Sequence, residues 1–165
     1  MKRIVMILFA AVMAAAVISA CQTDNGGTQS LDTRWAGEDI QEVVSSLEDQ
    51  FGGFDQAMME TNYRYNELYW AGQDANWGYA EYHLEKIVGS MERGFIRRPA
   101  REASASQFLN TNVPRLMETI EAGDRDAFLE YFGRFAASCN TCHEMEAVEF
   151  IQVIIPETRT SLVKF

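Results

Sequence analysis

A pentapeptide in the last fifth of the chain, Cys139-Asn140-Thr141-Cys142-His143, restricts the fold more than any other feature. On a helix, positions i, i+3 and i+4 share one face, so both thiols and the imidazole can point at one flat group. C-x-x-C-H is the attachment signature of a c-type haem, in which the thiols form thioethers and the histidine binds the iron. The motif therefore predicts one covalent haem c, with Cys139, Cys142 and His143 holding it and His143 as the metal ligand.

Two other uses of the C-x-x-C spacing each require something more. A structural zinc site needs four ligands, and the chain has no second Cys/His pair to complete them. A thioredoxin-like redox site belongs to a βαβ pattern, and no such pattern surrounds residues 139–143. Haem is therefore the better-supported interpretation of the motif.

The N-terminus has the features of an export signal. Lys2 and Arg3 precede an apolar run, residues 4–18, that is short for a membrane span. A basic start followed by such a run is typical of a secretory signal peptide, which we assign to residues 1–20. We therefore expect the protein to be exported.

The end of this signal, Ile18–Cys21 (ISAC), resembles the lipobox of bacterial lipoproteins. The resemblance implies that the chain is cut before Cys21, that this cysteine carries the lipid, and that the protein is anchored in the envelope facing the periplasm. Gln22 after the cysteine favours the outer membrane. Ordinary cleavage that leaves a free thiol is the alternative. Residues 22–30 are polar and contain glycine, so we expect residues 21–36 to form a lipidated N-terminus and a flexible tether.

Cysteine count and charge narrow the set of partners. The chain has three cysteines, one for the lipid and two for the haem, so none remains for a disulfide. Its 14 basic and 24 acidic residues give a formal net charge of −10. So acidic a protein should not bind nucleic acid, and it would attract a redox partner with a basic docking patch. The alternative is that the negative charge only keeps the protein soluble.

Helical spacing of apolar residues predicts a single all-α domain over residues 37–165. Asp124 should cap the last helix, which carries the haem motif. Pro114 must either kink the helix around it or start a shorter one. The β-branched residues of 148–155 favour an extended strap over a final helical turn. The other predicted helices span residues 38–51, 54–71, 77–97 and 104–122, the first two being separate or one helix kinked at the Gly52-Gly53 pair.

This order of helices, with the haem motif on the last one, resembles the cytochrome c′ family, whose members are four-helix bundles with haem in the core. The resemblance covers about residues 54–145, and its motif-level matches are Cys139, Cys142 and His143. It implies an all-α four-helix bundle with an extra N-terminal helix and haem on the last helix. The apolar residues at helical spacing in 40–51 could form a homodimer interface, or they could cover the bundle.

In that family the sixth iron position decides the function. An apolar residue on the first bundle helix leaves a five-coordinate haem that binds NO or CO, whereas a methionine gives a six-coordinate electron carrier. The resemblance puts Met58 or Met59 at this depth, although a methionine at helical spacing is usually core filler. The other histidine, His83, borders an apolar face, where a half-buried structural role is the ordinary one and bis-histidine ligation the alternative.

One departure from the family concerns the residues after the motif. Cytochromes c′ commonly have a basic residue there, whereas this chain has Glu144-Met145-Glu146. These carboxylates would lower the reduction potential if they faced the haem, but on a helix we expect them to face solvent.

The leading hypothesis is a membrane-tethered monohaem cytochrome that carries single electrons in the bacterial cell envelope and is not an enzyme. A gas-binding protein that buffers or senses NO or CO is the first alternative. An electron-transfer subunit of a larger oxidoreductase is the second.

Overall fold

The computed structural model describes residues 36–37 and 39–160 of the 165-residue chain. These residues belong to two compact units, one ending at Gln50 and one beginning at Phe51. The predicted signal peptide, the predicted lipidation site Cys21 and nearly all of the predicted tether lie outside the described residues. The predicted domain of residues 37–165 includes parts of both units.

The first unit contains all but the last residue of helix α2, Ile40–Phe51. Asp39 caps it, because its Oδ1 accepts hydrogen bonds from the backbone N–H groups of Gln41 and Glu42 at 2.8 and 3.0 Å. No residue of α2 is buried, and the side chain of Ile40 is 77% exposed. The predicted first helix is thus present and separate from the next one.

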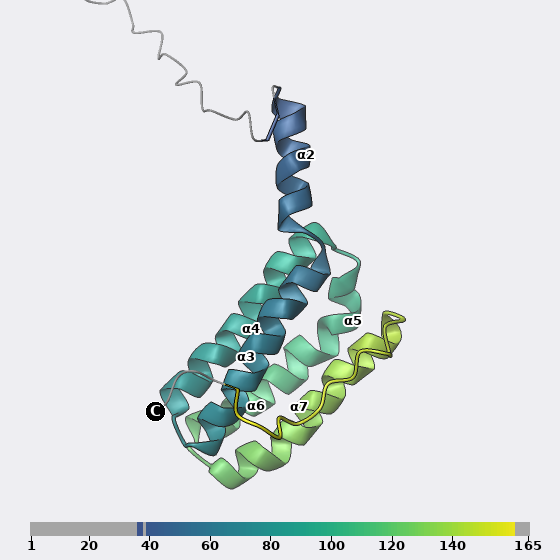
Figure 1. Cartoon of the computed structure of the whole chain (residues 1–165). Coiled ribbons are helices and arrows are strands. Elements are labelled where there is room, and N and C mark those ends of the chain that lie inside the picture. Colours follow the sequence, from purple (N-terminus) through teal and green to yellow (C-terminus); the bar gives the residue numbers. More distant parts are fainter. Residues whose placement is uncertain (1–35, 38, 161–165) are drawn as a thin grey trace, which may run out of the picture. The chain divides into compact units, whose positions relative to one another are not determined.

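The second unit is an up-and-down bundle of four helical segments (Figure 1). Helix α3 contacts α4, α4 contacts α6, α6 contacts α7, and α7 contacts α3 again. A closed ring of antiparallel neighbours joined by short loops is a four-helix bundle, the architecture that the family resemblance implies. The described residues contain no β-strand and no helix that is long and apolar enough to cross a membrane. The segments are α3 (Phe54–Gln73), α4 (Trp77–Arg97), the run of α5 (Arg101–Gln107), η1 (Phe108–Asn112) and α6 (Val113–Glu121), and α7 (Arg125–Met145).

Side-chain caps start two of these helices. Asn76 accepts a hydrogen bond from the backbone N–H of Tyr79 at the start of α4, at 3.3 Å. Asp124 accepts one from Ala127 at the start of α7, at 3.0 Å, as predicted. Each cap satisfies one of the N–H groups that a helix leaves unpaired in its first turn.

The third segment stays helical through Pro114 by way of one π-helical turn. Pro114 lies in the first turn of α6, and because it has no N–H it donates no helical bond there. Just before it, the Val113 N–H donates to the Phe108 carbonyl five residues earlier, as in a π turn. The chain therefore neither breaks nor starts a separately capped helix at this point.

The core of the bundle is built on aromatic side chains of α7. Phe128, Phe132 and Phe135 have no exposed surface. The ring centroids of Tyr65 and Tyr69 on α3 lie 4.9 and 5.0 Å from that of Phe132. Burying a phenylalanine contributes on the order of 1.5–3 kcal/mol, so this stripe fixes the face that α7 turns inward.

The chain reverses direction directly after α7. Ala147 adopts a left-handed conformation with φ of 56°, and the Val148 N–H donates to the His143 carbonyl at 2.9 Å. These features form a Schellman-type helix end. Residues 148–160, here called the strap, then run without helix along the bundle (Figure 1). The strap begins with a turn, in which the Ile151 N–H donates to the Val148 carbonyl at 2.9 Å, and the predicted extended strap is found in residues 152–155.

The far end of the strap is held on α3 and the loop after it. Arg159 forms an ion pair with Asp74 at 2.6 Å, and its guanidinium lies 4.9 Å from the ring centroid of Trp70. The Asn66 amide donates to the Thr160 hydroxyl at 3.2 Å. The Arg159 hydrogen bond holds the pKa of Asp74 below its ordinary value. The strap is therefore attached to the bundle by polar contacts.

Gly72 tests the contact between α3 and α7. A Cβ at this position would overlap the ring of Phe128. We expect Gly72→Ala to lower the free energy of unfolding by about 1–3 kcal/mol, since overpacking a filled core costs this much. Urea unfolding measures the change. Gly133 on α7 is the control, because a Cβ there would meet nothing within 4 Å, and Gly133→Ala should stabilise by about 0.5–1 kcal/mol. Equal effects at the two sites would contradict the close contact.

Candidate cofactor site

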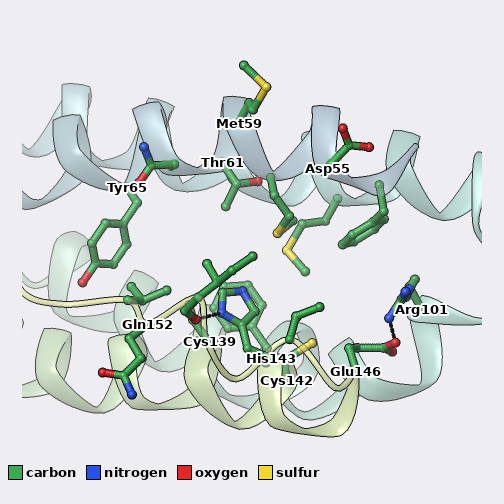
Figure 2. A pocket seen from close by; sticks show the side chains of 18 of the residues that line it. Asp55, Met59, Thr61, Tyr65, Arg101, Cys139, Cys142, His143, Glu146 and Gln152 are labelled. Atoms are coloured by element: carbon green, nitrogen blue, oxygen red, sulfur yellow. Dashed lines mark hydrogen bonds and ion pairs between the residues drawn. The ribbon is translucent and has the colours of Figure 1, made fainter. Parts of the chain in front are cut away.

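A cavity of about 960 Å³ lies between α3, α7 and the strap, with further lining from α4 and the α5–η1 run. Its volume is near the upper end of the roughly 300–1,000 Å³ of ordinary ligand pockets. Cys139, Cys142 and His143, the three residues of the predicted haem motif, all line it (Figure 2). The structure therefore brings the predicted attachment residues to one wall of a cavity of cofactor size.

That wall continues the aromatic stripe of α7. Phe135 is fully buried, and Cys139 and Cys142, four and seven residues later, pack against the same core. Both thiols are free. Burial, followed by the neighbouring Cys142, raises the pKa of the Cys139 thiol to about 12.

The chemistry of this thiol bears on the two alternatives to haem. Redox-active C-x-x-C cysteines have lowered pKa values that favour the thiolate, which is the opposite of the shift at Cys139. Within the part of the chain that the structure describes, no group of three or more His, Cys, Asp or Glu side chains is placed to hold a metal ion. Neither a dithiol redox site nor a zinc site gains support from this geometry.

His143 is held by the strap. Its Nδ1 lies 2.6 Å from the carbonyl oxygen of Ile151. The dashed line in Figure 2 marks this contact at the cavity wall. A carbonyl oxygen can only accept, so this contact needs the proton on Nδ1, and the neutral tautomer that makes it leaves the Nε2 lone pair for a metal.

Helix α3 forms the opposite wall. Thr61 and Tyr65 point from α3 toward α7 in Figure 2. Met58 precedes them by three and seven residues, which places it on the same helical face, and it lines the cavity while packing against the core. Met58 is thus on the wall that faces His143.

Met59 does not share this orientation. Successive residues on a helix are rotated by about 100°, so Met59 turns away from the face of Met58. Its side chain is 66% exposed and points away from the cavity, although its atoms reach the rim (Figure 2). Of the two methionines proposed as iron ligands, the geometry therefore favours Met58.

A second methionine, Met91, also lines the cavity, although the sequence does not single it out. It lies on α4, is 5% exposed and lines the cavity together with Met58. Its position in the apolar stripe of α4 predicts that it is buried, as it would be for any core residue. No local feature of the sequence distinguishes it as a residue of the cavity. The cavity is therefore lined by methionines from two helices, Met58 on α3 and Met91 on α4, whereas the sequence indicates only methionines of α3.

His83 lies elsewhere. It is 1% exposed, and it does not belong to the cavity lining. Its ring centroid is 4.2, 5.2 and 6.1 Å from those of Tyr79, Tyr82 and Tyr63, with near-perpendicular planes. Neither ring nitrogen has a hydrogen-bond partner among the described residues. The histidine is therefore fully buried rather than half-buried, and bis-histidine ligation gains no support.

One end of the cavity carries a charged network. Glu146 forms an ion pair with Arg101 and accepts a hydrogen bond from Ser104, both on α5, and all three line the cavity. The expectation that the two carboxylates face solvent holds for Glu144 and is wrong for Glu146. The reason is tertiary, because Arg101 draws this carboxylate inward. A basic group close to the motif thus comes from another helix.

Comparisons of the chain with protein-family models, with curated proteins and with solved structures find no match. The interpretation of the site therefore rests on its own residues.

His83 gives a pH-dependent prediction for stability. Burial, and after it the charge of Arg64, lowers the pKa of His83 to about 4 from 6.5, while Glu67 opposes the shift. Between these values the unfolded chain binds more protons than the folded one, so stability is complete above pH 6.5 and falls as the pH decreases toward 4. The histidine should account for a loss of up to about 3 kcal/mol.

Urea unfolding of the wild type and of His83→Phe, measured from pH 7 to pH 4.5, tests this prediction. The variant should lose stability less steeply with decreasing pH, since phenylalanine does not titrate. His83→Gln, which keeps a polar side chain, should flatten the profile as well. If both variants keep the wild-type slope, His83 is not the group responsible.

Proposed function

We propose that this protein is a monohaem c-type cytochrome that carries single electrons in the bacterial cell envelope. The observation that carries the proposal is the arrangement of Cys139, Cys142 and His143 on one wall of a cavity and Met58 on the facing wall. The residues present fit the group, because two thiols, an imidazole with a free Nε2 and a mostly apolar lining are what a covalent haem requires. When bound, the haem supplies reversible uptake and release of one electron.

The roles of the residues follow from their chemistry. Cys139 and Cys142 would hold the haem as thioethers, and His143 would be the proximal ligand. Met58 would supply the sixth ligand, which gives a low-spin iron that needs no ligand exchange during electron transfer. Two arginines of the lining, Arg98 and Arg101, are suited to the haem carboxylates, to which a guanidinium forms strong charge-assisted hydrogen bonds.

The same proposal places the protein outside the cytoplasm. Its support is the signal-like N-terminus and the lipobox-like Ile18–Cys21, which together predict export and a lipid anchor at Cys21. The excess of acidic residues favours a redox partner with a basic docking patch over nucleic acid. The protein would then act as a carrier and not as an enzyme.

The alternative function is binding of NO or CO. Its supporting observation is that Phe54 and Phe108 join Met58 in lining the cavity, which makes the surroundings of a sixth position largely apolar. A five-coordinate iron in such a pocket would bind a small gas. The two functions differ in whether a methionine sulfur reaches the iron.

An absorption spectrum of the mature protein, produced in a host with haem-attachment machinery, distinguishes these functions. We expect a covalently attached, low-spin haem that does not respond to CO. Met58→Ala should give a high-spin form that binds CO, whereas the matched variant Met91→Ala should remain low-spin. A wild-type spectrum that is high-spin and shifts with CO would favour gas binding. The absence of covalent haem would overturn the proposal as a whole.

Lipidation is tested separately by Cys21→Ser. The wild type should be found in the membrane fraction and should incorporate a labelled fatty acid. We expect the variant to lose the label and to leave the membrane fraction, because the chain then lacks the thiol that carries the lipid. Lipid labelling that persists in the variant would contradict the assignment.

A further inference from the structure

We propose that Asn140, the first variable residue of the C-x-x-C-H motif, positions the axial histidine by holding the strap in register against α7. The proposal rests on the proposed function, in which His143 binds the haem iron. It assigns a role to a residue that the motif itself leaves open, and it makes the strap part of the cofactor site.

The first step is the contact between Asn140 and Val153. The Asn140 Oδ1 accepts a hydrogen bond from the Val153 N–H at 2.7 Å, and its Nδ2 donates to the Val153 carbonyl at 2.9 Å. One side-chain amide thus satisfies both backbone groups of a single strap residue. Aspartate, which only accepts, and alanine, which does neither, cannot form this pair of bonds.

The second step is the register that this pair imposes. Asn140 and His143 are three residues apart and lie on one face of α7. The strap runs back along the helix after the reversal at Ala147, so a later strap residue meets an earlier helix residue. With Val153 held by Asn140, the carbonyl of Ile151 lies 2.6 Å from His143 Nδ1. A shift of one residue would remove this acceptor.

A contact from the other side of the cavity supports the same register. The Tyr65 hydroxyl on α3 donates to the carbonyl of Ile154 at 3.0 Å. Val153 is itself half-buried and packs against the core. Two neighbouring strap residues are therefore held by α7 and α3 together, which fixes the strap next to His143.

The chemical consequence lies in the imidazole. Donation from Nδ1 to a carbonyl fixes the tautomer and the ring plane and makes Nε2 a stronger electron donor. Stronger donation stabilises ferric over ferrous iron and lowers the reduction potential. Asn140 would act on this potential without touching the haem iron, which makes it a positioning residue.

The test compares Asn140→Ala with Thr141→Ala in the mature, haem-loaded protein. Thr141 is the matched control, because it neighbours Asn140 in the motif, is exposed, and bonds only to the Ala137 carbonyl of its own helix among the described residues, at 3.2 Å. We expect Asn140→Ala to raise the reduction potential. It should also speed the solvent exchange of the His143 Nδ1 proton seen by NMR of the ferric protein. Thr141→Ala should change neither quantity.

Val153→Pro is a second variant that leaves the motif intact. Proline has no N–H, so it removes the bond to Asn140 Oδ1 from the strap side. It should shift the potential and the proton exchange in the same direction as Asn140→Ala. If Asn140→Ala attaches haem poorly, the Val153→Pro variant tests the proposal in its place.

Two outcomes would count against different claims. If haem is attached and both variants keep the wild-type potential and exchange rate, Asn140 does not position His143. If the wild type attaches no haem, the proposed function fails. In that case the ¹⁵N shifts of His143 in the haem-free chain decide whether Asn140 still sets the Nδ1-protonated tautomer.

Discussion

Burial of the aromatic stripe on α7 determines how the rest of the second unit is arranged. Phe128, Phe132 and Phe135 have no exposed surface, and the rings of α3 pack against them. Because Cys139 and Cys142 continue the same stripe, the packing that stabilises the bundle also turns the motif toward the cavity. Fold and site thus depend on one helical face, and a change that rotated α7 would move both thiols and the imidazole together.

Much of the bundle could be predicted because its helices carry local signals. Apolar periodicity predicts α3, α4 and α7, and the Asp124 cap and the strap follow from residue type alone. The passage of the chain through Pro114 could not be predicted, since a single π turn shifts the register without leaving a periodic pattern. The separation of the chain at Gln50 is likewise a matter of tertiary contact and not of spacing.

Some residues of the candidate site could likewise be predicted from the sequence, and others depend on tertiary contacts. The proposed attachment residues belong to a contiguous motif, so the sequence singles them out directly, and the structure places all three at one cavity. The orientation of Met58 against Met59 depends on which face of α3 is buried, and apolar or aromatic residues on several faces of that helix leave this undetermined. Met91, Arg101 and the inward turn of Glu146 arise from contacts between helices far apart in the chain. His83 was expected at the edge of an apolar face and is enclosed by tyrosine rings instead.

The place of the strap after the motif has a consequence for the order of assembly. Its contact between Tyr65 and Ile154 joins residues 89 positions apart, and its ion pair between Asp74 and Arg159 joins residues 85 apart. Contacts between residues so far apart require the closure of a long loop, which slows their formation. During synthesis the two cysteines and His143 also emerge before the strap does. The wall that the strap provides would therefore close over the cavity last, leaving the motif accessible to a bulky planar group until then.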